Sequence, residues 1–399
     1  MPRRLAPAGA PIKLADLAQW ASVSVSTTDV GDALRQEIAD RFQVRHSVLV
    51  STGRAGMTLL LRAMRRCAPA DRDEVVLPSY TCYSVAASVV KAGLRPRLVD
   101  IVPETLDLSA HELARTDFSR VLAVVTTSLY GLPGDLPSIS RLARERGVFL
   151  IDDAAQAMGA QVQGRWSGTW GDAGLFSFDK GKNVAAVDGG VILTGSDELA
   201  RALRQEMAGL SAPGVAASAL HIVKALAYSV LLRPWLYGFA TRLPGLGLGK
   251  TVFSTDFPLE VSDRALVALG LTMIRRLDEF TRARVANATA LIEGLAGLAG
   301  IRVIQPLAGS LPVYLRLPVL FDSAGARDAA VEALNAVGIG STRSYPASLA
   351  DVPELQHLIV GDRLAAGGRR VASTIATLPT HPFVSTADRQ LTLVTLGAR

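Results

Sequence analysis

Three polar side chains in the centre of the sequence have the types and the spacing for cofactor chemistry. Asp153 comes two residues after the end of an apolar run, Ser177 lies in a later run, and Lys182 comes five residues after Ser177. A glycine-rich turn, residues 188–190, leads into a further apolar run. If these runs are strands, the three groups lie at neighbouring strand ends, where open α/β sheets bind their ligands.

A carboxylate, a hydroxyl and an amine together meet the needs of a pyridoxal phosphate site. The amine of Lys182 can form a Schiff base with the cofactor's aldehyde. The carboxylate of Asp153 can keep the pyridine nitrogen protonated, so that the ring accepts electrons from a Cα carbanion. The hydroxyl of Ser177 and nearby backbone amides can hold the phosphate. These residues therefore predict pyridoxal 5'-phosphate as the cofactor.

The turn at residues 51–56 is a second candidate for phosphate binding. It ends a predicted strand and opens a predicted helix, so the free amides of Gly53, Arg54 and Ala55 and the helix dipole would face an anion. The alternative interpretation is that the turn only begins a helix and binds no phosphate. The Arg54 guanidinium either adds a phosphate contact or points to solvent.

The surrounding segments indicate the fold that must position these groups. Seven short Val-, Ile- and Leu-rich runs lack strict alternation, as is typical of strands covered on both faces. Helical patterns lie between them at about 54–67, 81–92 and 135–146, the last capped by Asp135. Right-handed crossovers make a mostly parallel central sheet covered by helices the expected α/β fold. The predicted strands are Ser47–Val50, Glu74–Leu77, Arg97–Asp100, Leu122–Thr126, Val148–Ile151, Leu175–Phe178 and Val191–Thr194.

The C-terminal part of the chain has a different character. Helical periodicity runs from about 262 to 298, and a helix is expected near 325–337. Strands are expected at 301–304, 312–320 and 339–344. We therefore predict a large cofactor-binding domain, residues 1–250, and a smaller α+β domain, residues 251–399, that includes the long linking helix.

Composition excludes several classes of protein. With 49% hydrophobic and 20% charged residues the chain is globular and not disordered. The net charge of +6 is too diffuse to indicate nucleic acid binding. Two cysteines, Cys67 and Cys82, exclude a disulfide framework and favour the cytoplasm. The N-terminus does not read as a secretory signal, no run is long enough for a spanning helix, and the five scattered histidines predict no metal site.

An apolar insert at about 210–250 stands apart from this pattern. Residues 216–232 are almost entirely apolar, and His221, Lys224 and Tyr228 share one helical stripe. Two interpretations stay open for 216–249: a helix packed in a subunit or domain interface, or a hairpin at the inner face of a membrane. In the second, Lys224 and Arg233 would lie near the headgroups.

Several of these segments resemble the DegT/StrS family of fold-type I aminotransferases, which act on nucleotide sugars. The resemblance covers about residues 30–395 and rests on a set of motifs that occur in the family's order. These are DEVVLPSYTCYSVAASVVKAGLRPRLVDIVPETLDL, LYGLPGDL, IDDAAQAMGA, GDAGLFSF, KN, DGG and LPTHPF.

The resemblance implies roles for individual residues. Lys182 is similar to the lysine that carries the cofactor, Asp153 to the pyridinium partner and Ser177 to the phosphate hydroxyl. Gln156 resembles the residue that contacts the ring face or the phenolic oxygen. Asp152 takes a position at which the family usually has Glu.

Other positions depart from the family pattern. Where relatives often place a stacking aromatic residue, this chain has Cys82, with Tyr80 and Tyr83 beside it. Tyr83 is the candidate for stacking, and packing within a helix explains it equally well. Tyr345 and His381 resemble residues on the substrate side, and packing explains both equally well. The family's Asn-aromatic-Arg motif is absent from 256–266.

The resemblance implies a two-stage transfer of an amino group. L-glutamate would donate it, and a keto-sugar or similar keto substrate linked to a nucleotide would accept it. A homodimer is implied, because sites of this fold lie at a dimer interface. A dehydratase, in which His replaces the lysine, another pyridoxal enzyme such as a lyase, and a non-catalytic regulator or scaffold are the alternatives.

Overall fold

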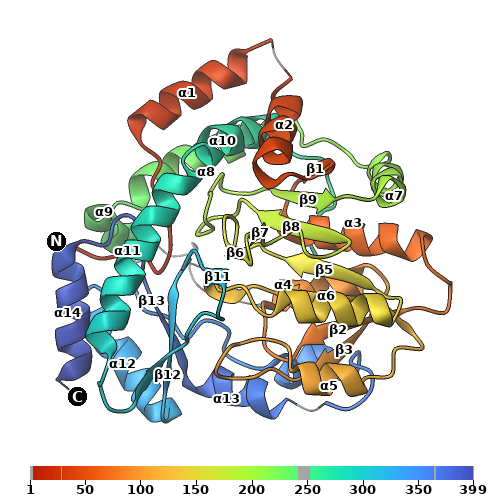
Figure 1. Ribbon diagram of the computed structural model, residues 1–399. Helices are drawn as coiled ribbons and strands as arrows, with labels where there is room; N and C mark the ends of the chain where they lie inside the picture. The colour runs from red at the N-terminus through yellow and green to blue at the C-terminus, as the bar shows by residue number, and fades with distance from the viewer. Residues whose placement is uncertain (1–2, 28, 241–251, 364, 399) are drawn as a thin grey trace.

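The computed structural model describes residues 3–27, 29–240, 252–363 and 365–398. Its centre is a seven-stranded sheet in the order β1-β9-β8-β5-β4-β2-β3 (Figure 1). All seven strands predicted from the sequence are present in this sheet, with ends shifted by one or two residues. They are β1 (His46–Val50), β2 (Glu74–Pro78), β3 (Arg95–Val99), β4 (Val121–Thr127), β5 (Phe149–Asp153), β8 (Ala173–Ser177) and β9 (Gly190–Thr194).

The sheet is mostly parallel, as predicted. The pairs β2–β3, β2–β4, β4–β5 and β5–β8 are parallel, whereas β9 runs antiparallel to both of its neighbours, β8 and β1. In β8, the adjacent residues Leu175 and Phe176 belong to two separate hydrophobic cores. Both faces of the sheet are therefore covered, which explains why the strands are apolar throughout.

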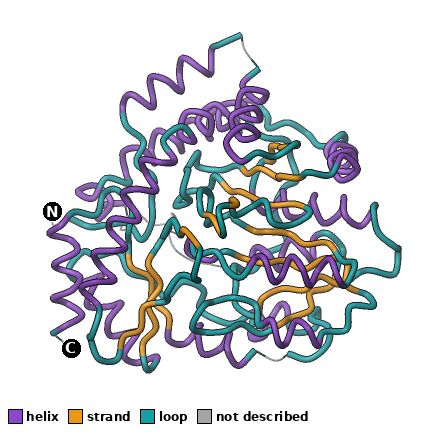
Figure 2. Tube along the Cα trace, in the orientation of Figure 1, coloured by secondary structure: helices purple, strands orange, loops and turns teal. Residues whose placement is uncertain are grey.

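Helices surround this sheet (Figures 1 and 2). The three predicted helices are present, and the Asp135 carboxylate caps α6 by accepting from the Ser138 amide at 3.2 Å. The helices of this part are α1 (Leu14–Val25), α2 (Val30–Phe42), α3 (Gly53–Arg66), α4 (Tyr83–Lys91), α5 (Ala110–Arg115), α6 (Leu136–Glu145), α7 (Asp197–Met207), α8 (Val215–Leu231) and α9 (Pro234–Ala240), with a short 3-10 turn at Leu129–Gly131.

The C-terminal part forms a second, three-stranded antiparallel sheet in the order β10-β12-β13, with helices beside it (Figure 1). The expected helical stretch 262–298 is two helices. The elements are α10 (Arg264–Ile274), α11 (Leu277–Leu295), β10 (Ile301–Val303), β12 (Leu317–Phe321), α12 (Ala324–Ala336), α13 (Ala366–Thr374), β13 (Ile375–Leu378) and α14 (Thr386–Gly397), with 3-10 turns at Leu349–Asp351 and Pro353–Leu355. A third small sheet joins β6 (Gln161–Val162), β7 (Arg165–Trp166) and β11 (Ser310–Leu311).

The strand expected at 339–344 is wrong. Only Thr342 forms a β-bridge there, to Thr377, and Ser344 has a left-handed backbone with φ of 59°. The N-terminal segment approaches so closely that a Cβ on Gly340 would lie 2.4 Å from the Leu5 carbonyl oxygen. The third strand of this sheet is β13, which the sequence analysis missed. The expected strand 312–320 is confirmed only in its second half, as β12.

The apolar stretch 216–232 forms the helix α8, which ends at Leu231, just before Arg233 and Pro234. Residues 241–249 of the insert lie outside the described residues. Within the described ranges, no helix combines the length and the apolar character that crossing a bilayer requires. The boundary at residue 250 between two domains stays a prediction.

Candidate active site

Neighbouring strand ends bring Asp153, Gln156 and Lys182 to one cavity, whereas the predicted phosphate residue Ser177 does not line it. Asp153 is the last residue of β5 and lies opposite Thr127 of β4 in the parallel register. Lys182 follows the end of β8, the strand on the other side of β5. Asp153, Gln156 and Lys182 all line this cavity, which we call the strand-end cavity; its other lining residues are Thr81, Cys82, Ser84, Val85, Thr127, Ser128, Leu129 and Ala155.

The two adjacent carboxylates of β5 have different surroundings, as expected for successive residues of a strand. Asp153 faces the strand-end cavity, and its Oδ1 accepts a hydrogen bond from the Ala155 amide at 3.0 Å. Burial raises the pKa of Asp153, while the Ala155 amide and the charge of Lys182 lower it. A carboxylate held this way, beside a cation, is suited to pair with a positively charged ring nitrogen.

Asp152 is fully buried and has a structural role. Its Oδ2 accepts from the amides of Gly168 at 2.6 Å and Trp170 at 3.2 Å, so it holds the turn that follows β7. Burial raises the pKa of Asp152 to about 6, against these two hydrogen bonds. It does not line the strand-end cavity.

A buried arginine fixes the loop that carries Lys182. The Arg284 guanidinium, from α11, donates to the carbonyl oxygens of Gly9 at 2.9 Å, Lys182 at 3.3 Å and Asn183 at 3.2 Å. Burial lowers the pKa of Arg284 to about 10. These contacts join three distant parts of the chain, which explains why sequence spacing gave no sign of Arg284.

The two predicted phosphate elements lie against each other. A Cβ on Gly53 would lie 3.3 Å from both Cβ and Oγ of Ser177, so the start of α3 and the end of β8 are in close contact. The Ala55 amide donates to the Thr52 hydroxyl at 2.9 Å, which caps α3. In the described part of the chain, the Gly53 and Arg54 amides meet no protein acceptor and stay free for an anion.

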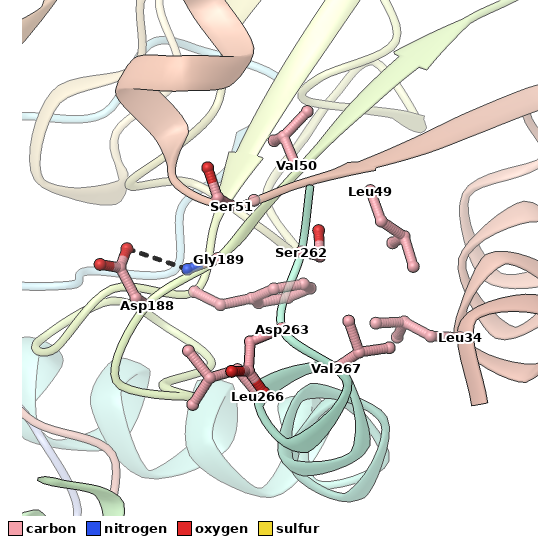
Figure 3. A pocket seen from close by; sticks show the side chains of 12 residues that line it. Leu34, Leu49, Val50, Ser51, Asp188, Gly189, Ser262, Asp263, Leu266 and Val267 are labelled. Atoms are coloured by element: carbon pink, nitrogen blue, oxygen red, sulfur yellow. Dashed lines mark hydrogen bonds between the residues drawn. The ribbon is translucent and has the colours of Figure 1, made fainter. Parts of the chain in front are cut away.

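The Arg54 side chain is exposed and leans over an aromatic ring. Its Cζ lies 5.0 Å from the centre of the Phe257 ring, and its charge lowers the pKa of the nearby Asp188 against the burial that raises it. Beside this turn, a narrow cavity of about 10 Å³ lies between Ser51, Asp188, Gly189 and the start of α10 (Figure 3). It has room for about one water molecule and is not a substrate site.

Gln156 connects the strand-end cavity to the C-terminal part. Its Oε1 accepts from the Tyr130 amide at 3.0 Å, and its Nε2 donates to the Tyr345 hydroxyl at 2.8 Å. The Tyr130 hydroxyl donates in turn to Ser344 at 2.6 Å. This network fixes the Gln156 side chain at the cavity wall and places Tyr345 beside it.

Two further candidates lie away from the cavity lining. The Tyr83 hydroxyl donates to the Ala347 carbonyl at 3.2 Å and accepts from the Ala347 amide at 2.9 Å; Cys82, and not Tyr83, lines the cavity. His381 is fully buried, and its Nε2 donates to the Ala6 carbonyl at 2.8 Å. Burial lowers the pKa of His381 to about 4. These three hydrogen bonds tie Tyr83 and His381 to neighbouring backbone and not to the strand-end cavity.

The chemistry of the strand-end cavity fits pyridoxal phosphate. The hydroxyls of Thr81 and Thr127 line it and are buried without a protein partner in the described structure. Buried polar groups normally have a hydrogen-bond partner, so these two hydroxyls are available to a bound molecule. Sequence reasoning missed both, although Thr127 ends β4 and Thr81 comes three residues after the end of β2. No group of residues suited to a metal ion occurs in the part of the chain that is described.

Comparisons with known proteins show the family of the chain. The sequence matches the DegT/DnrJ/EryC1/StrS aminotransferase family over residues 18–245 and 262–394. It is 31% identical over 317 residues to the UDP-N-acetyl-3-dehydro-alpha-D-glucosamine 3-aminotransferase of Acidithiobacillus ferrooxidans, covering 79% of this chain and 74% of that one. It is 29% identical over 357 residues to the GDP-perosamine synthase of Caulobacter vibrioides, covering 88% and 84%.

A solved structure has the same fold over the whole chain. The aminotransferase TlmJ from Streptoalloteichus hindustanus superposes with a TM-score of 0.80 at 28% identity, covering 99% of this chain and 98% of that one. The fold is therefore that of the fold-type I pyridoxal phosphate enzymes. The chain belongs to the DegT/DnrJ/EryC1/StrS family and is a pyridoxal 5'-phosphate-dependent aminotransferase of the sugar-modifying kind.

Proposed function

We propose that this enzyme transfers an amino group from L-glutamate to a keto-sugar attached to a nucleotide. The observation that supports this most is that Asp153, Gln156 and Lys182 line one cavity with two unpartnered hydroxyls. In this proposal Lys182 carries the cofactor, Asp153 pairs with its ring nitrogen, and Ser177 with the amides of Gly53 and Arg54 holds its phosphate.

The bound cofactor supplies an electron sink for the negative charge that develops at the donor's Cα. The Lys182 amine then has the central task, because it lies in the same cavity as Asp153. It would take the proton from the donor's Cα as general base and, as general acid, would deliver it to the C4′ carbon of the bound cofactor. The same steps in reverse deliver the amine to the keto-sugar.

The other residues orient the reacting groups and hold them in place. Asp153, charged and fixed by the Ala155 amide, keeps the proton on the ring nitrogen through both stages. Arg284 holds the backbone of Lys182 so that its amine returns to the same place after each proton transfer. Gln156, fixed at both ends of its amide, presents one remaining N–H at the cavity wall. Positioning of this kind supplies a large share of the rate enhancement.

The nucleotide-linked acceptor is supported by the names of the two curated relatives, which are UDP- and GDP-sugar enzymes. The glutamate donor, a homodimer and a cytoplasmic location rest on the family resemblance and the composition and stay predictions. Sedimentation velocity tests the assembly directly.

A half-reaction screen tests the proposed function. The enzyme is first incubated with L-glutamate and desalted, and we expect the visible absorbance of the bound cofactor to be replaced by that of its amine form. UDP-linked, GDP-linked and unlinked keto-sugars are then added separately, and the absorbance should return with one of the nucleotide-linked compounds. L-aspartate and L-alanine serve as donor controls. Failure of every amino acid to convert the cofactor would refute the amino transfer. Return of the absorbance with unlinked keto-sugars alone would refute the proposal that the acceptor is linked to a nucleotide.

A further inference from the structure

The helix α8 has its polar side toward the protein and its apolar side toward solvent. On the inner side, the Ser218 hydroxyl donates to Asp263 Oδ2 at 2.6 Å, and His221 Nδ1 contacts the same oxygen at 3.0 Å. The Tyr228 hydroxyl accepts from the Ala10 amide at 3.4 Å. A helix on a water-facing surface normally has the reverse arrangement, so something apolar should cover the outer side.

Eight large apolar side chains of α8 and α9 are exposed, and we call the surface that they form the α8–α9 face. Val215 is 89% exposed, Val223 59% and Trp235 59%. The remaining large apolar side chains of this face are Leu220, Ile222, Leu226, Val230 and Phe239. Half of the strongly exposed large apolar side chains in the described structure thus belong to two consecutive helices. Such a concentration marks an interaction surface and not ordinary exposure.

The charge of this segment indicates what kind of partner covers it. No Asp or Glu occurs from residue 207 to residue 255, whereas the chain average would place about four in a stretch of that length. The segment does contain basic residues, of which Lys224 is exposed on α8 and Arg233 lies between α8 and α9. An apolar surface that carries positive and no negative charge is complementary to an anionic lipid surface.

The aromatic residues support the same partner. Trp235 and Phe239 are one helical turn apart on α9 and both are exposed. Trp is enriched at the level of lipid headgroups, because its ring is apolar and its N–H is polar. Leu226 and Val223 on α8 would then enter the acyl region, while Lys224 reaches the headgroups through its long side chain.

We propose that the α8–α9 face binds the surface of an anionic phospholipid bilayer and so holds the enzyme at a membrane. The helix lies along the bilayer surface with its Asp263 contacts toward the protein. Tyr228, on the inner side of α8, also accepts a hydrogen bond from the Gly181 amide, next to Lys182. The membrane-bound helix therefore packs directly against the loop of the proposed catalytic lysine.

Co-sedimentation of the holoenzyme with vesicles tests this proposal. One set of vesicles contains 30% phosphatidylglycerol in phosphatidylcholine, and the other contains phosphatidylcholine alone. We expect the protein to pellet with the first set and at least about tenfold less with the second. The paired variant Val223→Glu with Leu226→Glu should lower binding by at least about tenfold, because it places two carboxylates in the apolar surface. Val394→Glu, an equally exposed site on α14, is the matched control and should bind like the wild type.

A second variant and two further readouts keep the test independent of folding. Lys224→Glu leaves the apolar surface intact and reverses its charge, so binding to anionic vesicles should fall by about tenfold or more. Cofactor absorbance and circular dichroism should match the wild type in every variant. Absence of pelleting with anionic vesicles, or pelleting that survives all three substitutions, would overturn the proposal. A change of oligomeric state in Val223→Glu with Leu226→Glu, measured by light scattering, would also overturn it and assign the face to a second copy of the chain.

Discussion

Replacing Asp152 by Asn should change how the stability of the enzyme depends on pH. The pKa of Asp152 is raised from 3.8 to about 6 because the carboxyl is buried. The folded protein therefore binds this proton more tightly than the unfolded chain does. The stabilisation by the bound proton is full below the unfolded pKa of 3.8 and is lost as the pH rises through 6.

The size of the effect follows from these two pKa values. Between pH 7.5 and pH 5 the wild type should gain about 1.4 kcal/mol from Asp152 alone. Asn has nearly the same shape, and its Oδ1 still accepts from the Gly168 and Trp170 amides, but it does not titrate. The difference in unfolding free energy between the wild type and Asp152→Asn should therefore shift by about 1.4 kcal/mol in favour of the wild type at pH 5.

Urea denaturation at pH 7.5 and pH 5, followed by tryptophan fluorescence under conditions in which refolding recovers the signal, measures this shift. Because both proteins share every other titrating group, the double difference isolates Asp152. A difference that stays constant between the two pH values would refute the reasoning. The same substitution should leave the glutamate half-reaction within about threefold of the wild type, whereas Asp153→Asn should slow it by at least about a hundredfold.

Three further substitutions test the contacts around the site. Arg284→Met should release the Lys182 loop and lower the melting temperature and the cofactor affinity together; an unchanged cofactor dissociation constant would contradict its role. Gly53→Ala should weaken cofactor binding by about tenfold, because the new methyl group crowds Ser177, and equilibrium dialysis measures this. The pKa of His381 is lowered to about 4, so the unfolded chain binds a proton at this ring more tightly than the folded protein does. The unfolding free energy should therefore fall by about 2 kcal/mol between pH 7.5 and pH 5. His381→Asn should remove this loss. If the unfolding free energy of His381→Asn depends on pH as that of the wild type does, the lowered pKa of His381 is contradicted.

Much of the fold follows from local sequence. The seven strands of the large sheet were predicted because they are short apolar runs bounded by helices, and covered strands have that pattern. Asp135 marked the start of α6 because a cap is a local feature. The strand at 339–344 was wrong because contacts with the N-terminal segment, over 330 residues away in sequence, decide the conformation of Gly340.

The candidate site was predictable where strand ends carry polar residues and unpredictable where distant segments meet. Asp153 and Lys182 follow strands, so the sequence indicated that they lie close together. The separate surroundings of Asp152, the packing of Tyr83 against Ala347 and the hold of Arg284 on the lysine loop all depend on tertiary contacts.

The central claim is that Lys182 carries the cofactor, and chemical trapping tests it most directly. Borohydride reduction of the holoenzyme, followed by proteolysis and mass spectrometry, should find the reduced cofactor on the peptide that contains Lys182. Lys180, two residues earlier in the same loop, is the internal control and should be unmodified. Label on Lys180 or on any other side chain, or no label at all, would contradict the account.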